Sequence, residues 1–188
     1  MKKVVITLFA AILAFNLSAQ ENEIFSKGDK VLNVGIGFGG GYYSGYSSGY
    51  SKTPFLSASF DVGLFDGFLD KATVGIGGYV GFSSAKWESG YNYGWKETNL
   101  VIGPRGTFNY QFIDKLDTYA GILLGYHNVS WKETGNWAGY GTYDSNSSGV
   151  YFSGFVGARY YLTENIAGML ELGSGGLSLA TIGVAVKF

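Results

Sequence analysis

The sequence contains no cysteine, only two prolines and few charged residues, which make up 14% of its 188 residues. The absence of cysteine excludes disulfide bonds, cysteine-based zinc sites, thiol catalysis and a lipid-modified cysteine anchor. The chain has 13 basic and 14 acidic residues, so it lacks the cationic surplus with which proteins bind nucleic acid phosphates. Because about 25% charged residues is usual for soluble domains, the low charge indicates that water is not the only solvent.

Glycine, tyrosine and phenylalanine are abundant, with 31, 15 and 14 residues respectively. No stretch after the N-terminal region shows the apolar spacing of an amphipathic helix. Instead, large apolar residues recur at even-numbered positions, with small or polar residues between them. This alternation predicts eight strands, at residues 32–38, 56–64, 73–82, 100–112, 118–130, 150–162, 165–173 and 180–188.

The first 19 residues have the pattern of a secretory signal peptide. Lys2 and Lys3 precede an apolar run at residues 4–15, and small residues follow before Gln20. The alternative, a membrane-spanning helix, needs about 20 apolar residues, and this run is shorter. We therefore expect residues 1–19 to be cleaved, which leaves an exported and mildly acidic chain.

The apolar face of each predicted strand is expected to meet lipid, because the opposite face is mostly glycine, serine or charged residues. Strands can cross hydrocarbon only as a closed barrel, since every backbone polar group there needs a partner. Eight strands of about 9 to 11 residues meet this requirement. The predicted fold class is all-β: an eight-stranded antiparallel up-and-down transmembrane β-barrel at residues 30–188, after a periplasmic segment at 20–29.

The predicted connections alternate in length, as in outer-membrane barrels, which have short periplasmic turns and longer extracellular loops. This places the barrel in the outer membrane of a Gram-negative bacterium, with both termini in the periplasm. The short connections are 66–67, 114–115 and 163–165, and the long ones, rich in Gly, Tyr, Ser and Asn, are 40–53, 84–98 and 131–149.

Aromatic residues at even positions near the strand ends predict two girdles on the lipid face, at the depths where such residues gather. Pro104 interrupts the fourth predicted strand, and because proline cannot donate to a ladder, we expect a bulge or a missing bond at residues 103–106. The predicted girdle residues are Phe38, Phe82, Tyr110, Phe112, Tyr126, Phe152, Tyr160 and Phe188.

The inside of an eight-stranded barrel is only just wide enough for side chains to fill. Buried charges are tolerated when they are paired and hydrogen-bonded, so polar residues at odd positions predict a plugged lumen, with Arg105 and Glu171 as an ion pair. The predicted lumen network comprises Asn33, Asp61, Arg105, Asn109, Gln111, His127, Arg159, Glu171 and Lys187.

The C-terminal stretch is the most specific part of the sequence. It runs from Tyr160-Tyr161-Leu162 through Glu171-Leu172-Gly173 to an alternating segment that ends in Phe188. With the eight alternating segments, it resembles the small eight-stranded outer-membrane barrels of the OmpA/OmpX type. The resemblance covers residues 30–188 and implies insertion by the barrel assembly machinery. By this resemblance, the recognition signal for the assembly machinery consists of Ile182, Val184, Val186 and Phe188.

Two local patterns imitate ligand sites without the required context. Residues 35–40 read G-x-G-x-x-G, but a dinucleotide fingerprint must open a helix, and none is predicted there. Residues 144–149 imitate the start of a calcium loop, whose twelfth position should be a carboxylate and is Phe155. We predict no cofactor and no metal.

His127 is the only histidine and raises the question of an enzyme. Some barrels of similar architecture are lipid A deacylases with a His and a Ser on one face of a strand. Here the nearest hydroxyl, Ser130, is three positions away and therefore on the opposite face. A lone His without an oriented nucleophile favours a structural role, so we predict no enzymatic activity.

Trp95-Lys96-Glu97-Thr98 recurs as Trp131-Lys132-Glu133-Thr134. Aromatic belts favour Trp at headgroup depth, so the first interpretation is that both Trp residues anchor the rim in lipid. The second is that the repeat binds a surface ligand, since Tyr and Trp are common in binding loops.

The sequence predicts a non-enzymatic outer-membrane barrel that contributes to envelope integrity and displays Tyr/Gly-rich loops for surface interaction. Its expected partners are outer-membrane lipid and lipopolysaccharide, the assembly machinery during insertion and an unknown surface ligand. Two alternatives stay open: a lipid-modifying enzyme of the deacylase type and a soluble periplasmic carrier of the lipocalin type.

Overall fold

The computed structural model describes residues 24–39, 50–66, 69, 71–89, 93–134, 144–173 and 177–188. The predicted signal peptide at 1–19 lies outside these residues, as does most of the predicted connection at 40–53. In the described part of the chain, no helix is long and apolar enough to span a membrane.

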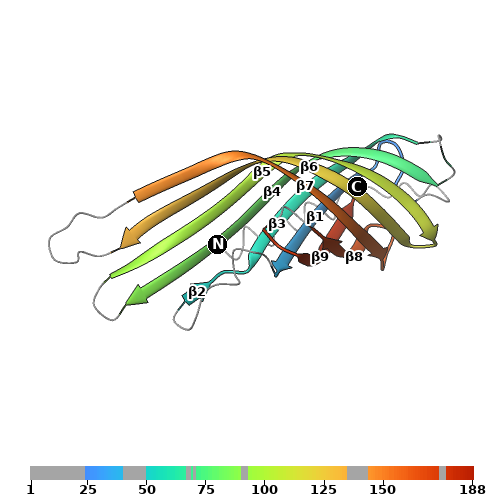
Figure 1. The fold of residues 1–188 in the computed structure, drawn as a ribbon. Helices are drawn as coiled ribbons and strands as arrows, with labels where there is room; N and C mark the ends of the chain where they lie inside the picture. Colours follow the sequence, from blue (N-terminus) through green and yellow to red (C-terminus); the bar gives the residue numbers. More distant parts are fainter. Residues whose placement is uncertain are drawn as a thin grey trace.

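Nine antiparallel strands form one sheet within the described residues, and eight of them close into a ring (Figure 1). Strand β2 pairs only with β4, while β1 pairs with both β3 and β9, and β4 pairs with β5. The predicted fold class is confirmed. The strands are β1 (Lys30–Phe38), β2 (Tyr50–Lys52), β3 (Phe55–Phe65), β4 (Ala72–Ser89), β5 (Tyr93–Ile113), β6 (Leu116–Thr134), β7 (Asp144–Tyr161), β8 (Ile166–Leu172) and β9 (Ala180–Lys187).

The two faces of the ring differ as the alternation predicts. Apart from Phe65 and Ile113, which follow register shifts, most odd positions of the wall point inward and are buried. Large apolar residues at even positions point outward, for example Ile76, Ile122 and Ile182, which are 49%, 56% and 53% exposed. In a closed ring all backbone groups of the wall can pair between neighbouring strands. The arrangement is an apolar exterior around a polar interior, the transmembrane barrel that the sequence predicts.

The strands from β4 to β7 are 18 to 21 residues long, whereas the predicted segments are 10 to 13 residues long. The prediction that residues 84–98 form a long loop is therefore wrong: β4 continues to Ser89 and β5 starts at Tyr93. Likewise, much of 131–149 belongs to β6 and β7. Outside the apolar band both faces meet a polar environment, so the apolar alternation disappears while the hydrogen-bonded ladder continues.

We call the extended end of the sheet the wing. It lies at the left of Figure 1, opposite the short β3–β4, β5–β6 and β7–β8 connections. The paired strands of β4, β5 and β6 run side by side through it, and β2 extends it beyond β4. The wing comprises residues 50–52, 83–89, 93–99, 128–134 and 144–149.

Pro104 removes ladder pairings without shifting the register. Ile102 faces Tyr126 and Arg105 faces Leu123, which is one uninterrupted register, but no pairing joins Gly103 or Pro104 to β6. On the other side, Pro104 faces Gly78 in a regular ladder. Of the two expected outcomes, the missing bond is observed and the bulge is not.

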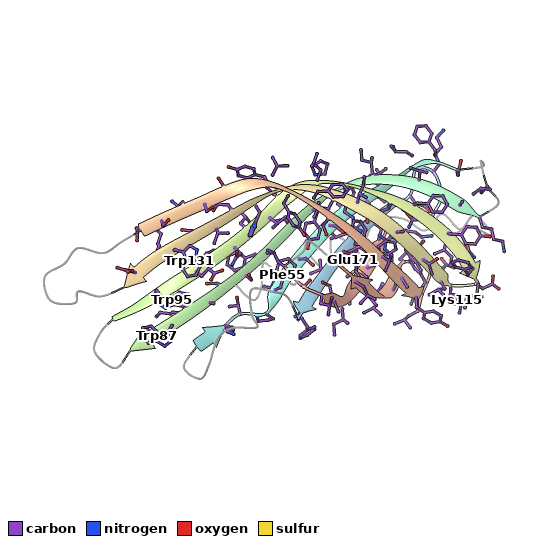
Figure 2. All side chains as sticks on the ribbon, viewed as in Figure 1. Phe55, Trp87, Trp95, Lys115, Trp131 and Glu171 are labelled. Carbon is purple, nitrogen blue, oxygen red and sulfur yellow. The ribbon has the colours of Figure 1, made fainter. Side chains whose placement is uncertain are left out.

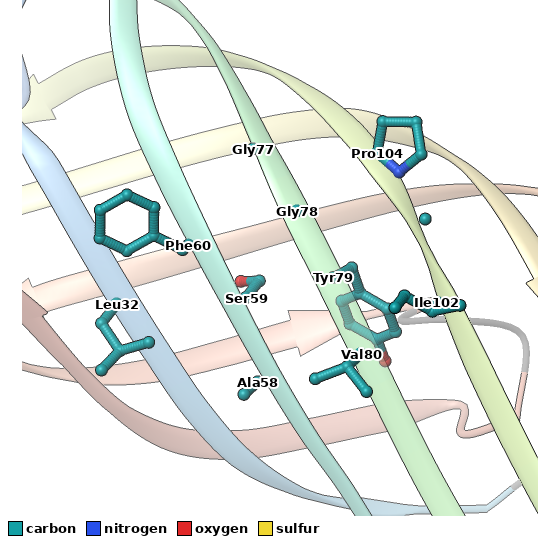
Figure 3. Close-up of a pocket in the computed structure, with 11 residues that line it drawn as sticks. Leu32, Ala58, Ser59, Phe60, Gly77, Gly78, Tyr79, Val80, Ile102 and Pro104 are labelled. Atoms are coloured by element: carbon teal, nitrogen blue, oxygen red, sulfur yellow. The ribbon is translucent and has the colours of Figure 1, made fainter.

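The outer wall has a shallow apolar depression at this point (Figure 3). The small residues Gly78 and Ala58 form its floor, and the larger Phe60, Ile102 and Pro104 border it. Because these residues lie on the outward face, the depression belongs to the apolar exterior rather than to the lumen.

Side chains fill the interior in layers. An upper apolar cluster, on the side of the wing, contains Phe55, Tyr79, Val101, Leu123 and Phe155, together with Tyr119 and Leu177. A lower cluster contains Phe25, Val31, Tyr161, Ala167 and Ala185. Charged residues lie between the two clusters. The Arg159 guanidinium, for example, is 4.3 Å from the ring centroid of Tyr119 in the upper cluster and 5.7 Å from that of Phe25 in the lower one.

Candidate functional site

Five charged side chains from five strands meet in the middle of the lumen. Arg159 binds Asp61 through Nη2 at 2.6 Å and Asp117 through Nη1 at 2.8 Å. Arg105 binds Asp61 at 3.1 Å and Glu171 at 3.0 Å. All five side chains are at most 3% exposed. The ion pair predicted between Arg105 and Glu171 is present.

Two amides and a phenol add hydrogen bonds to this cluster. Asn33 accepts a bond from Arg159 Nε at 2.9 Å and donates to Asp61 at 3.0 Å, which ties its amide orientation to both charges. Asn109 donates to both oxygens of Asp117 at 3.0 Å. Tyr119 donates to Glu171 Oε2 at 2.9 Å. Each carboxylate therefore has a cation and at least one neutral donor.

The cluster is a network of ion pairs and hydrogen bonds. Its carboxylates accept bonds from guanidinium, amide and phenol donors. Among their described contacts, none joins a carboxylate to a histidine that could activate a serine hydroxyl. Arg105 also lies 4.1 Å over the Phe155 ring, which covers the cation with an apolar surface. Among the residues that the structure describes, no group of three or more His, Cys, Asp or Glu side chains could hold a metal ion.

The predicted lumen residues separate into three places. Asn33, Asp61, Arg105, Asn109, Arg159 and Glu171 share the central cluster, whereas Gln111 and Lys187 lie at the lower end and His127 lies near the wing. The prediction missed Asp117 and Tyr119. Asp117 was one residue before the predicted start of its strand, and Tyr119 was not singled out although its odd position predicts that it points inward.

Residues 24–29 pack into the lower end of the barrel. Ile24 N–H donates to Gln111 Oε1 at 2.9 Å, and Lys187 Nζ donates to the Ile24 carbonyl at 3.0 Å. The Phe25 ring is 5% exposed within the lower cluster, and its carbonyl accepts a bond from Thr73 Oγ1 at 2.8 Å. The segment thus closes the end of the lumen that lies opposite the wing.

Replacing Phe25 by Ala is expected to lower the free energy of unfolding by about 3 to 5 kcal/mol, since a buried aromatic ring leaves a cavity when it is removed. Urea unfolding of the barrel refolded in lipid vesicles measures the effect. Lys27→Ala, which removes an exposed side chain of the same segment, is the control and should change stability by less than about 0.5 kcal/mol. Equal losses for the two variants would contradict the packing role of Phe25.

A second polar cluster lies at the base of the wing, next to the upper apolar cluster. Asn99 Nδ2 donates to Glu97 Oε1 at 2.7 Å, which turns the amide oxygen of Asn99 toward His127 Nε2, 3.0 Å away. His127 Nε2 must therefore carry the proton in this contact. Ser130 has the outward register of Thr98, so it lies on the opposite face from His127, as predicted. The deacylase arrangement of His and Ser is not formed by this pair.

The Trp residues of the repeated motif lie on the inner face of the wing (Figure 2). Trp87 pairs with Trp95 across two strands, and the Trp95 and Trp131 ring centroids are 5.1 Å apart. The interpretation that these residues anchor the rim in lipid is wrong, because Trp95 and Trp131 share the inner face with Glu97, which is opposite Trp131 and 2% exposed. The Lys residues of the repeat, at even positions, take the outer face instead.

The predicted girdle residues all lie at outward positions, six of them exposed, while Tyr110 and Phe188 are half-buried. Tyr110 contacts Phe112, with ring centroids 4.7 Å apart. Phe188 follows β9, and its N–H donates to the Lys30 carbonyl at 2.8 Å. Ile182 and Val184 are exposed on the outer face of β9, with Val186 half-buried.

No protein-family model matches the chain, and no curated protein matches it significantly. Among solved structures, it is similar to Ail, the attachment invasion locus protein of Yersinia pestis, in complex with the heparin analogue sucrose octasulfate. The TM-score is 0.55 at 10% identity, and the match covers 86% of this chain and 99% of that one. A second crystal structure of Ail gives a TM-score of 0.51 at 11% identity, with the same coverage.

The N-terminal β-barrel domain of Pseudomonas aeruginosa OprF also matches, with a TM-score of 0.37 at 15% identity and coverage of 87% of this chain and 98% of the domain. At these identities the Ail matches show the fold alone. The chain has the fold of the small eight-stranded outer-membrane barrels.

Proposed function

We propose that this chain is a non-enzymatic outer-membrane barrel with a plugged lumen, which contributes to envelope integrity and presents its wing and loops to surface ligands. Residues 1–19 act as the cleaved signal peptide, and both ends of the mature chain lie in the periplasm. The observation that carries the proposal is the closed ring with an apolar exterior and a charged interior. A soluble carrier of the lipocalin type needs the opposite arrangement.

The filled interior supports a structural role over a channel or an enzyme. The central charges are at most 3% exposed, two apolar clusters cover them from above and below, and residues 24–29 close the lower end. Insertion proceeds through the barrel assembly machinery, with Ile182, Val184, Val186 and Phe188 as the recognition strand. The exposed outer face of β9 at Ile182 and Val184 fits this role.

Two observations support surface interaction at the wing, the end opposite residues 24–29 and Phe188. The wing extends the sheet well past its apolar band, and its inner face carries three Trp residues beside the polar group of Glu97, Asn99 and His127. Aromatic rings next to a few oriented polar groups are typical of ligand sites. Ail, which shares the fold, has been crystallised with a heparin analogue.

The proposed function predicts that the chain fractionates with the outer membrane, migrates differently on gels before and after heating, and forms no conducting pore in planar bilayers. Lipid A mass spectra from cells with and without the gene are expected to be identical. Recovery of the mature chain in the soluble periplasm would support the carrier, and a changed acyl pattern of lipid A would support the enzyme. Either result would refute the proposal.

A further inference from the structure

Three lysines form a row across the outer face of the wing. Lys86 faces Lys96 in the register of β4 and β5, and Lys96 faces Lys132 in the register of β5 and β6. Directly opposed residues on neighbouring strands have Cβ atoms about 5 Å apart. Three ammonium groups therefore share one line across three strands, on the side of the wall that also carries the apolar exterior.

The outer face is layered below this row. The next outward row along the strands consists of Ser84, Thr98 and Ser130, which are paired in the same registers. Phe82 and Leu100 follow, exposed at 38% and 41%, and they belong to the apolar band. The order from the band outward is apolar, hydroxyl, cationic.

The height of the row follows from strand geometry. Lys86 and Lys96 are each four residues beyond the last exposed apolar residue of their strand. Four residues span about 13 Å along a strand, or about 10 Å along the membrane normal for a strand tilted by about 40°. The cations therefore lie just above the hydrocarbon, at the depth of lipid headgroups.

Like charges directly opposite each other destabilise a sheet, so the row needs anions. Glu88 forms an ion pair with Lys86 at 2.5 Å, and Asp144 faces Lys132 in the register of β6 and β7. These carboxylates flank the two ends of the row, while Lys96 in the middle has a lysine opposite it on both sides. A positive charge thus remains at the centre, on the face turned toward the surrounding lipid.

We propose that Lys86, Lys96 and Lys132 form a binding site for the phosphate groups of lipopolysaccharide molecules that surround the barrel. This inference rests on the proposed function, because it requires an outer membrane around the wall. The lipid A part of such a molecule carries phosphates on a sugar unit above its acyl chains. Its acyl chains pack on Phe82 and Leu100, its sugar hydroxyls meet the hydroxyl row, and its phosphates reach the lysine row.

The test measures the dissociation constant of diphosphoryl lipid A for the refolded, immobilised barrel in zwitterionic detergent. Lys96→Gln is expected to weaken binding about five-fold, the change that corresponds to about 1 kcal/mol per basic residue at an anionic surface. The variant with all three lysines changed to Gln should weaken it about 100-fold. Dephosphorylated lipid A should bind the native barrel as weakly as diphosphoryl lipid A binds this triple variant.

Lys52→Gln is the matched control. Lys52 lies in the same wing, but it faces Ala85 in the register of β2 and β4, and the side chain of Ala85 is buried on the inner face. This variant removes the same charge from the opposite face and should keep the native affinity. Raising the salt concentration from about 0.05 to 1 M should also weaken binding to the native barrel, which tests the site without any substitution.

The proposal is overturned if the triple variant binds lipid A with an affinity within two-fold of that of the native barrel. It is also overturned if Lys52→Gln weakens binding as much as Lys96→Gln does. Insertion into vesicles, read from heat-modifiable migration, separates this failure from that of the proposed function. A chain that inserts in no vesicle refutes the outer-membrane barrel itself. A chain that inserts normally and shows no lysine dependence refutes only the lysine site.

Discussion

Replacing Arg159 by Met is expected to lower the free energy of unfolding by about 3 to 5 kcal/mol, the loss typical of breaking a buried ion pair from one side. Arg159 is fully buried and binds both Asp61 and Asp117. Asp61 keeps Arg105 as a partner in the variant, whereas Asp117 keeps only the neutral Asn109 amide among its described contacts. Urea unfolding of the barrel refolded in vesicles measures the loss.

A double variant separates the charge effect from a packing effect. Adding Asp117→Asn to Arg159→Met removes the carboxylate that the first change leaves without a cation, so part of the lost stability should return. Lys30→Met, an exposed lysine at the start of β1, serves as the control for loss of one positive charge and should stay within about 0.5 kcal/mol of the native barrel. If the double variant loses the sum of the two single losses, the coupling between Arg159 and Asp117 is refuted.

The facing of the wall was predictable from sequence because one side of a strand repeats every two residues. Ile122 and Leu123 are both large aliphatic residues but differ in parity, and the structure places them outward and inward accordingly, at 56% and 1% exposure. The wing was not predictable in this way. At Ser84, Thr98 and Ser130 the outer face meets a polar environment, so its residues no longer differ in polarity from inner ones such as Ser83 and Asn99.

The interior was predictable only in part. Parity and depth along the strands were enough to pair Arg105 with Glu171. The contact of Arg159 with Asp61 crosses the lumen and depends on the stagger of strands on different sides of the ring, which alternation does not encode. Asp117 is opposite Arg159 on the neighbouring strand, and that register is not encoded by alternation either. Phe25 was missed for another reason. Residues 24–29 do not alternate, and their place is set by the space that the lower end of the barrel leaves between its own side chains.

Replacing Ile122 by Arg is expected to lower the free energy of unfolding by about 2 to 4 kcal/mol, the penalty for a cation at the bilayer midplane on the lipid face of a barrel. Ile122 is 56% exposed, and on β6 it lies between the outward residues Ala120 and Leu124, inside the apolar band. Its large exposure is the reason that the loss, if found, reports on lipid. The same substitution on a water-exposed wall would change stability by less than about 0.5 kcal/mol.

Ser130→Arg provides the matched comparison, because Ser130 lies eight residues further along the same strand and on the same outer face, in the hydroxyl row of the wing. A cation near the interface costs only about 0 to 1 kcal/mol, and phosphates of the surrounding lipid can bind it there. Urea unfolding in vesicles of phosphatidylcholine should therefore show a large loss for Ile122→Arg and a small one for Ser130→Arg. Equal losses at the two positions would mean that the apolar band does not contact hydrocarbon, and the transmembrane placement of the wall would have to be abandoned.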